Sequence, residues 1–335
     1  MAIPAHQPNP ESIFNALTAY QQTMALTGAI DLEIFTHIAD GALTVKDIAQ
    51  RSKASERGVR ILCDYLTIHG FLSKTGDRYD LSADSAVFLN KRSPAYLGAI
   101  ANFLVNDRGL SQFRHVADIV RHGGTLDPGN MAPDDPVWVE FARSMVPIVI
   151  MPARSIAPVV SEPGRKMKVL DIAAGHGMFG ISVALHNPAA EIVAVDWKNV
   201  LEVALENATK AGVAGRYRTI AGSAFDVDLG TGYDVVLIPN FLHHFDPPTN
   251  VKLLKKVRAA LKPGGLAATL EFVPNVDRVT PPTAAAFSLM MLGSTPHGDA
   301  YTFIELDRMF REAGFGESAM RDLPPSPERL ILTKS

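Results

Sequence analysis

The sequence predicts an α/β protein in which a doubly wound, mainly parallel sheet follows a mostly helical N-terminal region. Two observations carry this prediction. From Lys166 onward, short apolar segments alternate with helical segments at the spacing that is typical of βαβ units. Before that point, longer apolar patterns with helical periodicity dominate. Because 335 residues is long for a single domain, two domains are expected.

Composition excludes several classes of function. Charged residues make up 20% of the chain and the formal net charge is −3, which gives no electrostatic case for binding nucleic acid or a membrane. The single cysteine, Cys63, lies in an apolar helical segment, so a disulfide framework is impossible. Residues 1–12 lack the features of a signal peptide, and no apolar run is expected to be long enough to span a bilayer. A soluble, cytoplasmic protein is therefore expected.

The N-terminal region is predicted to form a helix and then a winged helix-turn-helix. Residues 10–37 carry apolar side chains at helical spacing, and this stripe packs either on its own domain or on another chain. Thr44 and Ser55 are expected to cap two further helices, and residues 71–82 are expected to form a β-hairpin. The second helix has too few basic residues to anchor a DNA backbone, which favours a structural or dimerising role.

Residues 84–163 are predicted to be mainly helical. The segment after Asp135 is rich in Met, Phe and Trp, and most of these side chains are expected to be core. One or two of them are expected to line an apolar substrate pocket, with candidates at Trp138, Phe141, Met145 and Met151.

The C-terminal region contains the predicted sheet. Five strands are expected near 168–173, 191–196, 217–221, 233–239 and 266–272, with an antiparallel hairpin at 317–322 and 329–333. The intervening helices are expected near 177–186, 200–211, 249–261 and 303–313. In such a sheet the ligand lies across the carboxyl ends of the parallel strands, so the loops that follow them form the site.

A glycine turn follows the first of these strands in the segment KVLDIAAGHGMFG, residues 168–180. Gly175 and Gly177 let the backbone turn tightly and approach a ligand, and the next helix directs free N–H groups into the turn. The spacing also fits a dinucleotide site, with Asp196 as the ribose-binding acid. Asp171 favours the cationic ligand S-adenosylmethionine (SAM) over a nicotinamide cofactor, because a carboxylate there would repel a pyrophosphate.

The loops after the next strands supply further candidate cofactor contacts. Asp196 is expected to accept hydrogen bonds from the ribose hydroxyls, and Trp197 to pack on the adenine. The segment Ser223, Ala224 and Phe225 is expected to contact the adenine edge, and Asn240 is also assigned to the cofactor site.

Two adjacent histidines, His243 and His244, follow the fourth strand. An imidazole is well suited to take a proton from a phenol. A metal site is less favoured, because neighbouring positions rarely bind one ion and no Cys or carboxylate cluster supports it. A purely structural histidine pair stays open, and no metal is expected.

Residues 10–335 resemble the plant-type small-molecule O-methyltransferases of the caffeic acid and hydroxyindole kind, which also occur in bacterial natural-product pathways. The matching pieces are LDIAAGHG, VAVDW, AGSAF, NFLHHFDP and LKPGG. The resemblance implies a class I methyltransferase fold, with a Rossmann-like seven-stranded sheet behind a winged-helix dimerisation domain. It also implies a homodimer, SAM as cofactor with S-adenosylhomocysteine as product, and His243 as general base.

The resemblance also divides the chain. Residues 1–100 would form the dimerisation domain, 101–163 a helical linker contributing to the substrate pocket, and 164–335 the SAM-binding domain. Two positions depart from the family pattern. Ser223 stands where an acid is usual, and Ala300 stands where a glutamate would orient the base, with Asp299 or Glu271 as possible substitutes.

The resulting hypothesis is a SAM-dependent O-methyltransferase acting on a hydroxyl of a small aromatic or polyketide-like molecule. Phe287 and Met291, on a helical stretch after the fifth strand, are further candidates for the pocket wall. Two alternatives stay open: a SAM-binding relative with decarboxylase, hydroxylase or pericyclase chemistry, and a nicotinamide-dependent oxidoreductase.

Overall fold

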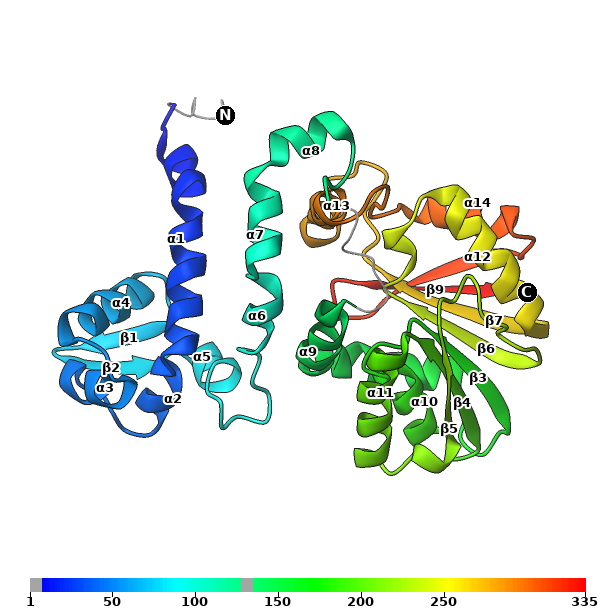
Figure 1. The fold of residues 1–335 in the computed structure, drawn as a ribbon, viewed down its shortest axis with the longest axis horizontal. Helices are drawn as coiled ribbons and strands as arrows, with labels where there is room; N and C mark the ends of the chain where they lie inside the picture. The colour runs from blue at the N-terminus through cyan, green and yellow to red at the C-terminus, as the bar shows by residue number, and fades with distance from the viewer. Residues whose placement is uncertain (1–7, 128–134) are drawn as a thin grey trace, which may run out of the picture. The chain divides into compact units, whose positions relative to one another are not determined.

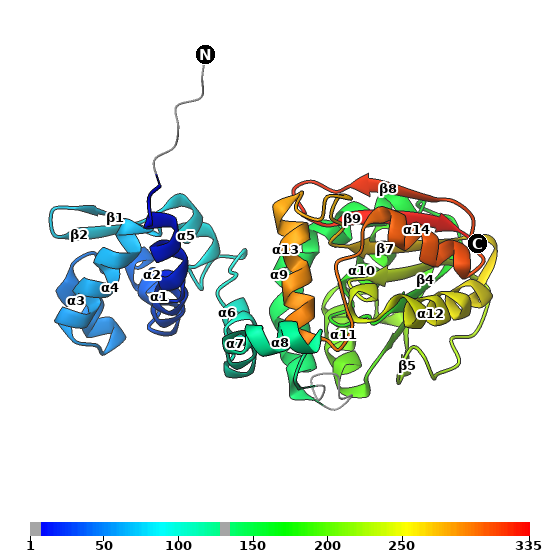
Figure 2. The same cartoon turned by 90° about the horizontal axis from the view of Figure 1, so that it is seen from above.

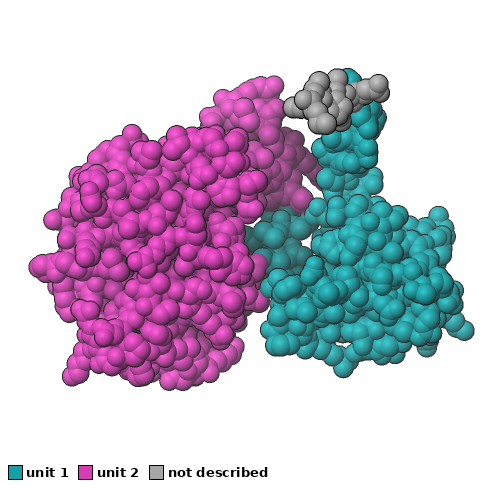
Figure 3. Space-filling view, turned by 180° about the vertical axis from the view of Figure 1, so that it is seen from behind, with its two compact units in different colours: residues 1–106 teal, residues 107–335 magenta. Residues whose placement is uncertain are grey.

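A computed structural model describes residues 8–127 and 135–335. The chain forms two compact units, residues 1–106 and residues 107–335, each of which is described by itself (Figure 3). Part of the Pro- and Gly-bearing loop that precedes Asp135 in the sequence lies outside the described residues.

The first unit is built from helices around a short β-hairpin (Figure 1). The Thr44 and Ser55 hydroxyls accept hydrogen bonds from the amides of Asp47 (3.3 Å) and Gly58 (3.1 Å), which confirms both predicted caps. The hairpin pairs antiparallel, as predicted. The elements are α1 (Glu11–Asp31), α2 (Ile34–Ala39), α3 (Val45–Ser52), α4 (Glu56–Ile68), β1 (Leu72–Thr75), β2 (Arg78–Leu81), α5 (Ala83–Phe88) and α6 (Ile100–Leu104).

Helix α1 leaves its N-terminal half uncovered by the described part of its own unit. Four large apolar side chains there are between 62% and 68% exposed, namely Ile13, Phe14, Leu17 and Tyr20. Near the other end of the helix, Ala29 is fully buried in the core of the unit. The apolar stripe therefore has a free part that its own domain does not use.

The second unit contains a seven-stranded sheet in the order β5-β4-β3-β6-β7-β9-β8. The pairs among β3 to β7 are parallel, whereas β9 pairs antiparallel with β7 and β8. This confirms the predicted doubly wound sheet with a hairpin closing one edge. The strands are β3 (Met167–Ile172), β4 (Ala190–Asp196), β5 (Tyr217–Ala221), β6 (Tyr233–Pro239), β7 (Leu261–Glu271), β8 (Ser318–Asp322) and β9 (Arg329–Lys334).

Helices cover both faces of this sheet (Figures 1 and 2). One face packs on α9 (Pro136–Val160), α10 (Met178–His186) and α11 (Lys198–Lys210). The other packs on α12 (Pro247–Ala260) and α14 (Phe303–Glu312). Successive β3 residues alternate between the two cores, as a strand buried on both faces must. Helices α7 (Asp107–Arg114) and α8 (Val116–His122) both pack on α13 (Pro282–Ser294).

Helix α9 corrects one expectation from the sequence. By length and composition alone it could cross a membrane, with a mean hydropathy of 1.2 over an 18-residue window. Such a helix is also found in the cores of soluble proteins, and α9 packs against α10 and α11. Its buried residues join the core on one face of the sheet, among them Val149, Ala153, Ile156 and Val160.

The carboxyl ends of the five parallel strands meet at one edge of the sheet. Strand pairing places Ile172 beside Val195, and Pro239 beside Leu270. The glycine turn after β3, the loops after β4 and β5, the histidine loop after β6 and the end of β7 are thereby brought to the same edge.

Candidate active site

The glycine turn after β3 is held in a conformation that requires glycine. Gly175 and Gly177 have φ values of 56° and 76°, in the left-handed region. A Cβ atom at Gly177 would lie 2.7 Å from the Tyr217 hydroxyl. The turn therefore combines a positive φ with a close approach of another side chain.

Gly177→Ala is expected to weaken binding of S-adenosylhomocysteine by about tenfold or more, because the turn must move to admit the methyl group. Calorimetry on the purified protein measures the dissociation constant. Gly212→Ala is the matched control, since Gly212 has a similar φ of 72° with nothing within 4 Å of its Cβ position. Equal losses in the two variants would show that close packing under Gly177 is unimportant.

Two carboxylates bind main-chain amides of the glycine turn and of the start of α10. Asp171 Oδ2 accepts a hydrogen bond from the Gly180 amide (2.9 Å), and Asp196 Oδ2 accepts one from the Gly175 amide (2.8 Å). Burial raises the pKa of Asp171 to about 7 and that of Asp196 to about 6. Asp171 Oδ1 is buried with no hydrogen-bond partner. An anionic ligand would add a further negative charge beside these two buried acids, which is unfavourable. A cationic group or hydroxyl donors would interact favourably with them. The residues therefore fit SAM better than a pyrophosphate.

The loop after β5 lies beside Asp196. Its Gly222 amide donates to the Asp196 carbonyl (2.9 Å), and the Ser223 hydroxyl accepts from the Phe225 amide (3.2 Å). Ala224 is buried in the core of one face. Trp197, at the start of α11, packs beside Val200 in a small cluster that includes residues of α9.

His243 forms a buried pair with Glu271, the last residue of β7. The His243 Nδ1 atom lies 2.5 Å from Glu271 Oε2, and the two side chains are only 7% and 3% exposed. Glu271 Oε1 accepts hydrogen bonds from the amides of Phe241 (3.0 Å) and Leu242 (2.8 Å). An ionised carboxylate only accepts hydrogen bonds, so it places the imidazole proton on Nδ1 and leaves Nε2 as the basic atom.

Further hydrogen bonds fix the backbone that carries His243. The side-chain amide of Asn250 donates to the carbonyls of Leu242 (2.8 Å) and Phe245 (3.1 Å). The Asp299 amide donates to the His243 carbonyl (3.0 Å), and the Tyr301 hydroxyl donates to the Phe245 carbonyl (2.6 Å). The imidazole is therefore held by its ring partner and by its main chain.

His244 differs from its neighbour in its environment. Its ring lies edge-on to Trp138 with the centroids 6.2 Å apart, and 4.4 Å from the ring of His243. Its Nδ1 atom is buried without a hydrogen-bond partner. Burial, with a smaller effect from His243, lowers the pKa of His244 well below its usual value, so this ring stays neutral.

The structure distinguishes the two acids that could orient His243. Glu271 contacts the ring, whereas Asp299 forms an ion pair with Arg278 (3.1 Å). Ala300 is fully buried. Of the two acids, Glu271 is therefore the one whose side chain contacts the imidazole.

Glu328 is a buried acid near the site that the sequence did not single out. It is 8% exposed, accepts a hydrogen bond from the Ser326 hydroxyl (2.9 Å) and lies near Asn240, which follows β6 with a positive φ of 53°. Burial raises the pKa of Glu328, and the nearby charge of Glu271 adds to this effect. No motif surrounds Glu328, so pattern alone gave no signal.

The predicted pocket residues lie in different surroundings. Phe287 of α13 is edge-on to His243 (centroids 4.9 Å apart) and stacks on Phe272 (4.2 Å). Phe141 is edge-on to Trp138 (6.3 Å). Met291 is buried, and Met145 packs against the core beneath α9. The structure thus brings Phe287 into contact with the His243 ring.

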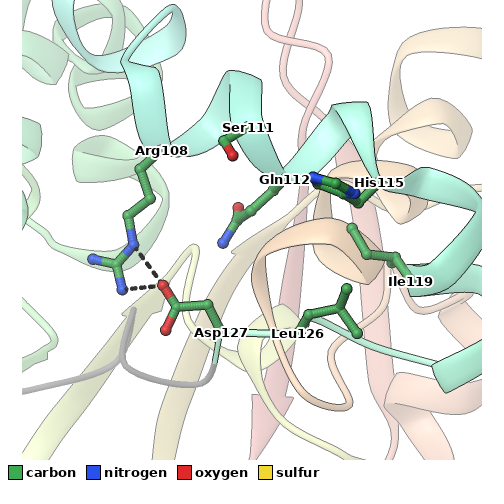
Figure 4. Close-up of a pocket in the computed structure, with 7 residues that line it drawn as sticks. All are labelled: Arg108, Ser111, Gln112, His115, Ile119, Leu126 and Asp127. Atoms are coloured by element: carbon green, nitrogen blue, oxygen red, sulfur yellow. Dashed lines mark hydrogen bonds and ion pairs between the residues drawn. The ribbon is translucent and has the colours of Figure 1, made fainter.

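A separate cavity of about 250 Å³ lies between α7, α8 and the segment after α8 (Figure 4). None of the predicted site residues lines it. Arg108, its one guanidinium, forms ion pairs with Asp127 (2.9 Å) and Asp135 (2.8 Å). Within residues 8–127 and 135–335, no group of three His, Cys, Asp or Glu side chains could hold a metal ion.

Comparison with known proteins identifies the family. Residues 139–316 match the O-methyltransferase domain, and residues 14–91 match the O-methyltransferase dimerisation domain. A Nostoc punctiforme crystal structure provisionally assigned as an O-methyltransferase is 49% identical, covers 98% of this chain and 100% of its own, and has a TM-score of 0.95.

Two characterised proteins are more distant. A Streptomyces sahachiroi 3-hydroxy-5-methyl-1-naphthoate 3-O-methyltransferase is 28% identical over 92% of this chain and 90% of its own. Human N-acetylserotonin methyltransferase, solved in complex with SAM, shares the fold at 19% identity, with a TM-score of 0.86 over 100% of this chain and 99% of its own. Neither the fold nor the family match supports a nicotinamide-dependent or non-methylating enzyme. The chain belongs to the O-methyltransferase family whose members carry an N-terminal dimerisation domain.

Proposed function

We propose that this O-methyltransferase methylates a hydroxyl of a small aromatic or polyketide-like molecule, with His243 as the general base. The observation that carries the proposal is the 2.5 Å contact between His243 Nδ1 and Glu271. It lies at the same sheet edge as the glycine turn and Asp196, which would hold SAM. When bound, SAM supplies an electrophilic methyl group and is converted to S-adenosylhomocysteine.

The cofactor site would use several parts of this edge. Gly175 and Gly177 let the backbone approach the amino-acid part, and Asp196 accepts hydrogen bonds from ribose hydroxyls. The adenine would lie against Trp197 and the loop after β5, with Asn240 at the end of β6 completing the cofactor site. The contacts from that loop are assigned to Ser223, Ala224 and Phe225.

The reacting proton moves between substrate and His243. The substrate hydroxyl would give its proton to Nε2 as its oxygen takes the methyl group, with the bond from that carbon to sulfur breaking and S-adenosylhomocysteine as the leaving group. Glu271 keeps the proton on Nδ1 and stabilises the imidazolium that forms. The neutral His244 would not compete for the proton, and we assign it to the aromatic wall beside the base.

The acceptor class follows from the apolar surroundings of the base. Phe287 and Phe272 form a stacked pair at His243, and Trp138 lies edge-on to His244. Flat aromatic molecules suit such a surface. The relative from Streptomyces sahachiroi, named for methylating a hydroxynaphthoate, supports the same class. Phe141, Met145 and Met291 would complete the pocket.

An assay with SAM and a panel of phenols, naphthols and hydroxynaphthoates tests this proposal. The expected result is an O-methylated product with an equal amount of S-adenosylhomocysteine. Matched acceptors in which a methoxy group replaces the hydroxyl serve as controls and should give no product. Transfer to carbon or nitrogen, with none to any hydroxyl, would contradict the proposal.

Cofactor binding is expected to depend on pH. Burial raises the pKa of Asp171 to about 7 and of Asp196 to about 6, above the ordinary value of 3.8. Because the folded-state pKa of each carboxyl is raised, the two groups contribute to the stability of the free protein below their ordinary pKa of 3.8. This contribution is lost as the pH rises through the two raised pKa values. Ribose hydroxyls favour ionised Asp196, so S-adenosylhomocysteine should raise Tm more at about pH 8 than at about pH 5.5. Thermal denaturation with and without the ligand measures this; an equal or opposite trend would contradict it.

We further propose a homodimer formed through the N-terminal domain, in a protein located in the cytoplasm. The match to the dimerisation domain and the uncovered apolar face of α1 support the dimer.

Leu17→Glu, which places a charge at the centre of that face, is expected to shift the protein towards monomer. Light scattering after size exclusion measures the mass. Ile304→Glu, at a similarly exposed position on α14, is the control and should leave the mass unchanged. A Leu17→Glu dimer as stable as the wild type would contradict this assignment.

A further inference from the structure

The loop after β5 forms a closed turn that satisfies its own amide groups. The Ser223 carbonyl accepts hydrogen bonds from the amides of Asp226 (2.9 Å) and Val227 (3.0 Å). The Ser223 hydroxyl accepts from the Phe225 amide (3.2 Å). Gly222, with φ of 135°, ties the start of the turn to the Asp196 carbonyl. These bonds use the amides of the turn and leave the Phe225 and Val227 carbonyls for a donor from another element.

Lys256 of α12 binds two of these carbonyls. Its Nζ atom donates to the Phe225 carbonyl at 2.9 Å and also to the Val227 carbonyl. Hydrogen bonds from a charged donor are stronger than those between neutral groups. Lys256 is half-buried, whereas the adjacent Lys255 is exposed. One ammonium group thus joins α12 to the end of the turn.

The same turn packs against the loop that carries the base. The ring of Phe225 lies edge-on to Phe245 with the centroids 5.0 Å apart, and 6.3 Å from Phe241. These two phenylalanines flank the histidines in the sequence. A shift of the Phe225 carbonyl would therefore disturb the cofactor loop and its packing on the histidine loop together.

Serine at position 223 makes this external support more important. Its hydroxyl oxygen is engaged inside the turn, and its side chain carries no charge with which to fix the loop. The charged group that binds this turn is instead the Lys256 ammonium, which donates to its carbonyls.

We propose that Lys256 is a positioning residue for the nucleoside side of the cofactor site. By holding the carbonyls of Phe225 and Val227, it keeps residues 223–225 in a shape that is ready to receive the adenine before the ligand arrives. Such preorganisation improves affinity because binding need not order the loop. The inference rests on the proposed function in one respect, that the ligand at this edge is SAM or its product.

Calorimetry with S-adenosylhomocysteine tests this role. Lys256→Met keeps the aliphatic stem and removes the ammonium, and it is expected to raise the dissociation constant about tenfold. Lys256→Arg keeps a charged donor and should stay within about threefold of the wild type. Lys255→Met removes a neighbouring exposed charge from the same helix and should bind as the wild type does. Lys256→Gln serves as the second neutral variant if the methionine variant does not fold.

A second ligand separates a local effect from general loosening. 5′-Methylthioadenosine keeps the nucleoside and lacks the amino-acid part, so Lys256→Met should weaken it by the same factor as S-adenosylhomocysteine. Wild-type affinity in the neutral variants, or equal losses in Lys256→Met and Lys256→Arg, would overturn the inference. Failure of the wild type to bind S-adenosylhomocysteine would instead overturn the proposed cofactor site, so the two failures are distinguishable.

Discussion

Replacing His243 with alanine is expected to lower kcat for O-methylation by about two to four orders of magnitude. Among the histidines of the described residues, only His243 has its ring in contact with a buried carboxylate. Its Nδ1 atom lies 2.5 Å from Glu271 Oε2. Loss of that base leaves the acceptor hydroxyl protonated when its oxygen must attack. Steady-state assays with saturating SAM and acceptor measure the change.

The control for this variant is its affinity for the cofactor product. S-Adenosylhomocysteine should bind the His243→Ala protein within about threefold of the wild type, because the glycine turn and Asp196 are unchanged. A variant that binds this ligand normally and still methylates at the wild-type rate at every pH would contradict the base assignment.

Replacing Glu271 with glutamine is expected to lower kcat by about a hundredfold or more, with a smaller change in the KM for SAM. Glutamine keeps the size of the side chain and an oxygen that can accept from the amides of Phe241 and Leu242. Its amide nitrogen, however, would donate to Nδ1 and leave the imidazole proton on Nε2. A protonated Nε2 cannot accept the proton of the substrate hydroxyl. Kinetics as a function of pH on the purified variant measure the loss.

Glu328→Gln is the matched control for this substitution. Glu328 is also a buried carboxyl at this end of the sheet, but its side chain accepts a hydrogen bond from the Ser326 hydroxyl and none from the imidazole. A much smaller loss is therefore expected. Equal losses in the two variants would indicate that buried negative charge matters and that the tautomer of His243 does not.

The sequence predicted the parts of the fold that depend on local pattern. Alternating segments placed β3 to β6 to within one residue at each end, because strands buried on both faces are continuously apolar. Strand β7 begins at Leu261, five residues before its expected start at 266. Hydroxyl side chains before helices located the caps at Thr44 and Ser55. The glycine spacing located the turn after β3, where Gly175 and Gly177 have positive φ.

Contacts that depend on strand order could not be predicted in this way. Glu271 and Asp299 were both open as partners of His243, since choosing between them requires the end of β7 to be placed beside the loop after β6. Glu328 was missed for the same reason. Strand β9 inserts between β7 and β8 and pairs Arg329 with Glu271, which brings residue 328 to the site from the end of the chain.

The central claim, that His243 removes the proton from the acceptor hydroxyl, is tested most directly with acceptors of different acidity. The experiment measures methylation of a phenol and of its nitro-substituted analogue by the wild type and by His243→Ala, at a pH where only the analogue is ionised. The account predicts a large loss of kcat for the phenol and a much smaller one for the ionised analogue, which needs no base. An equal loss for both acceptors would show that His243 serves structure or binding and would contradict the account.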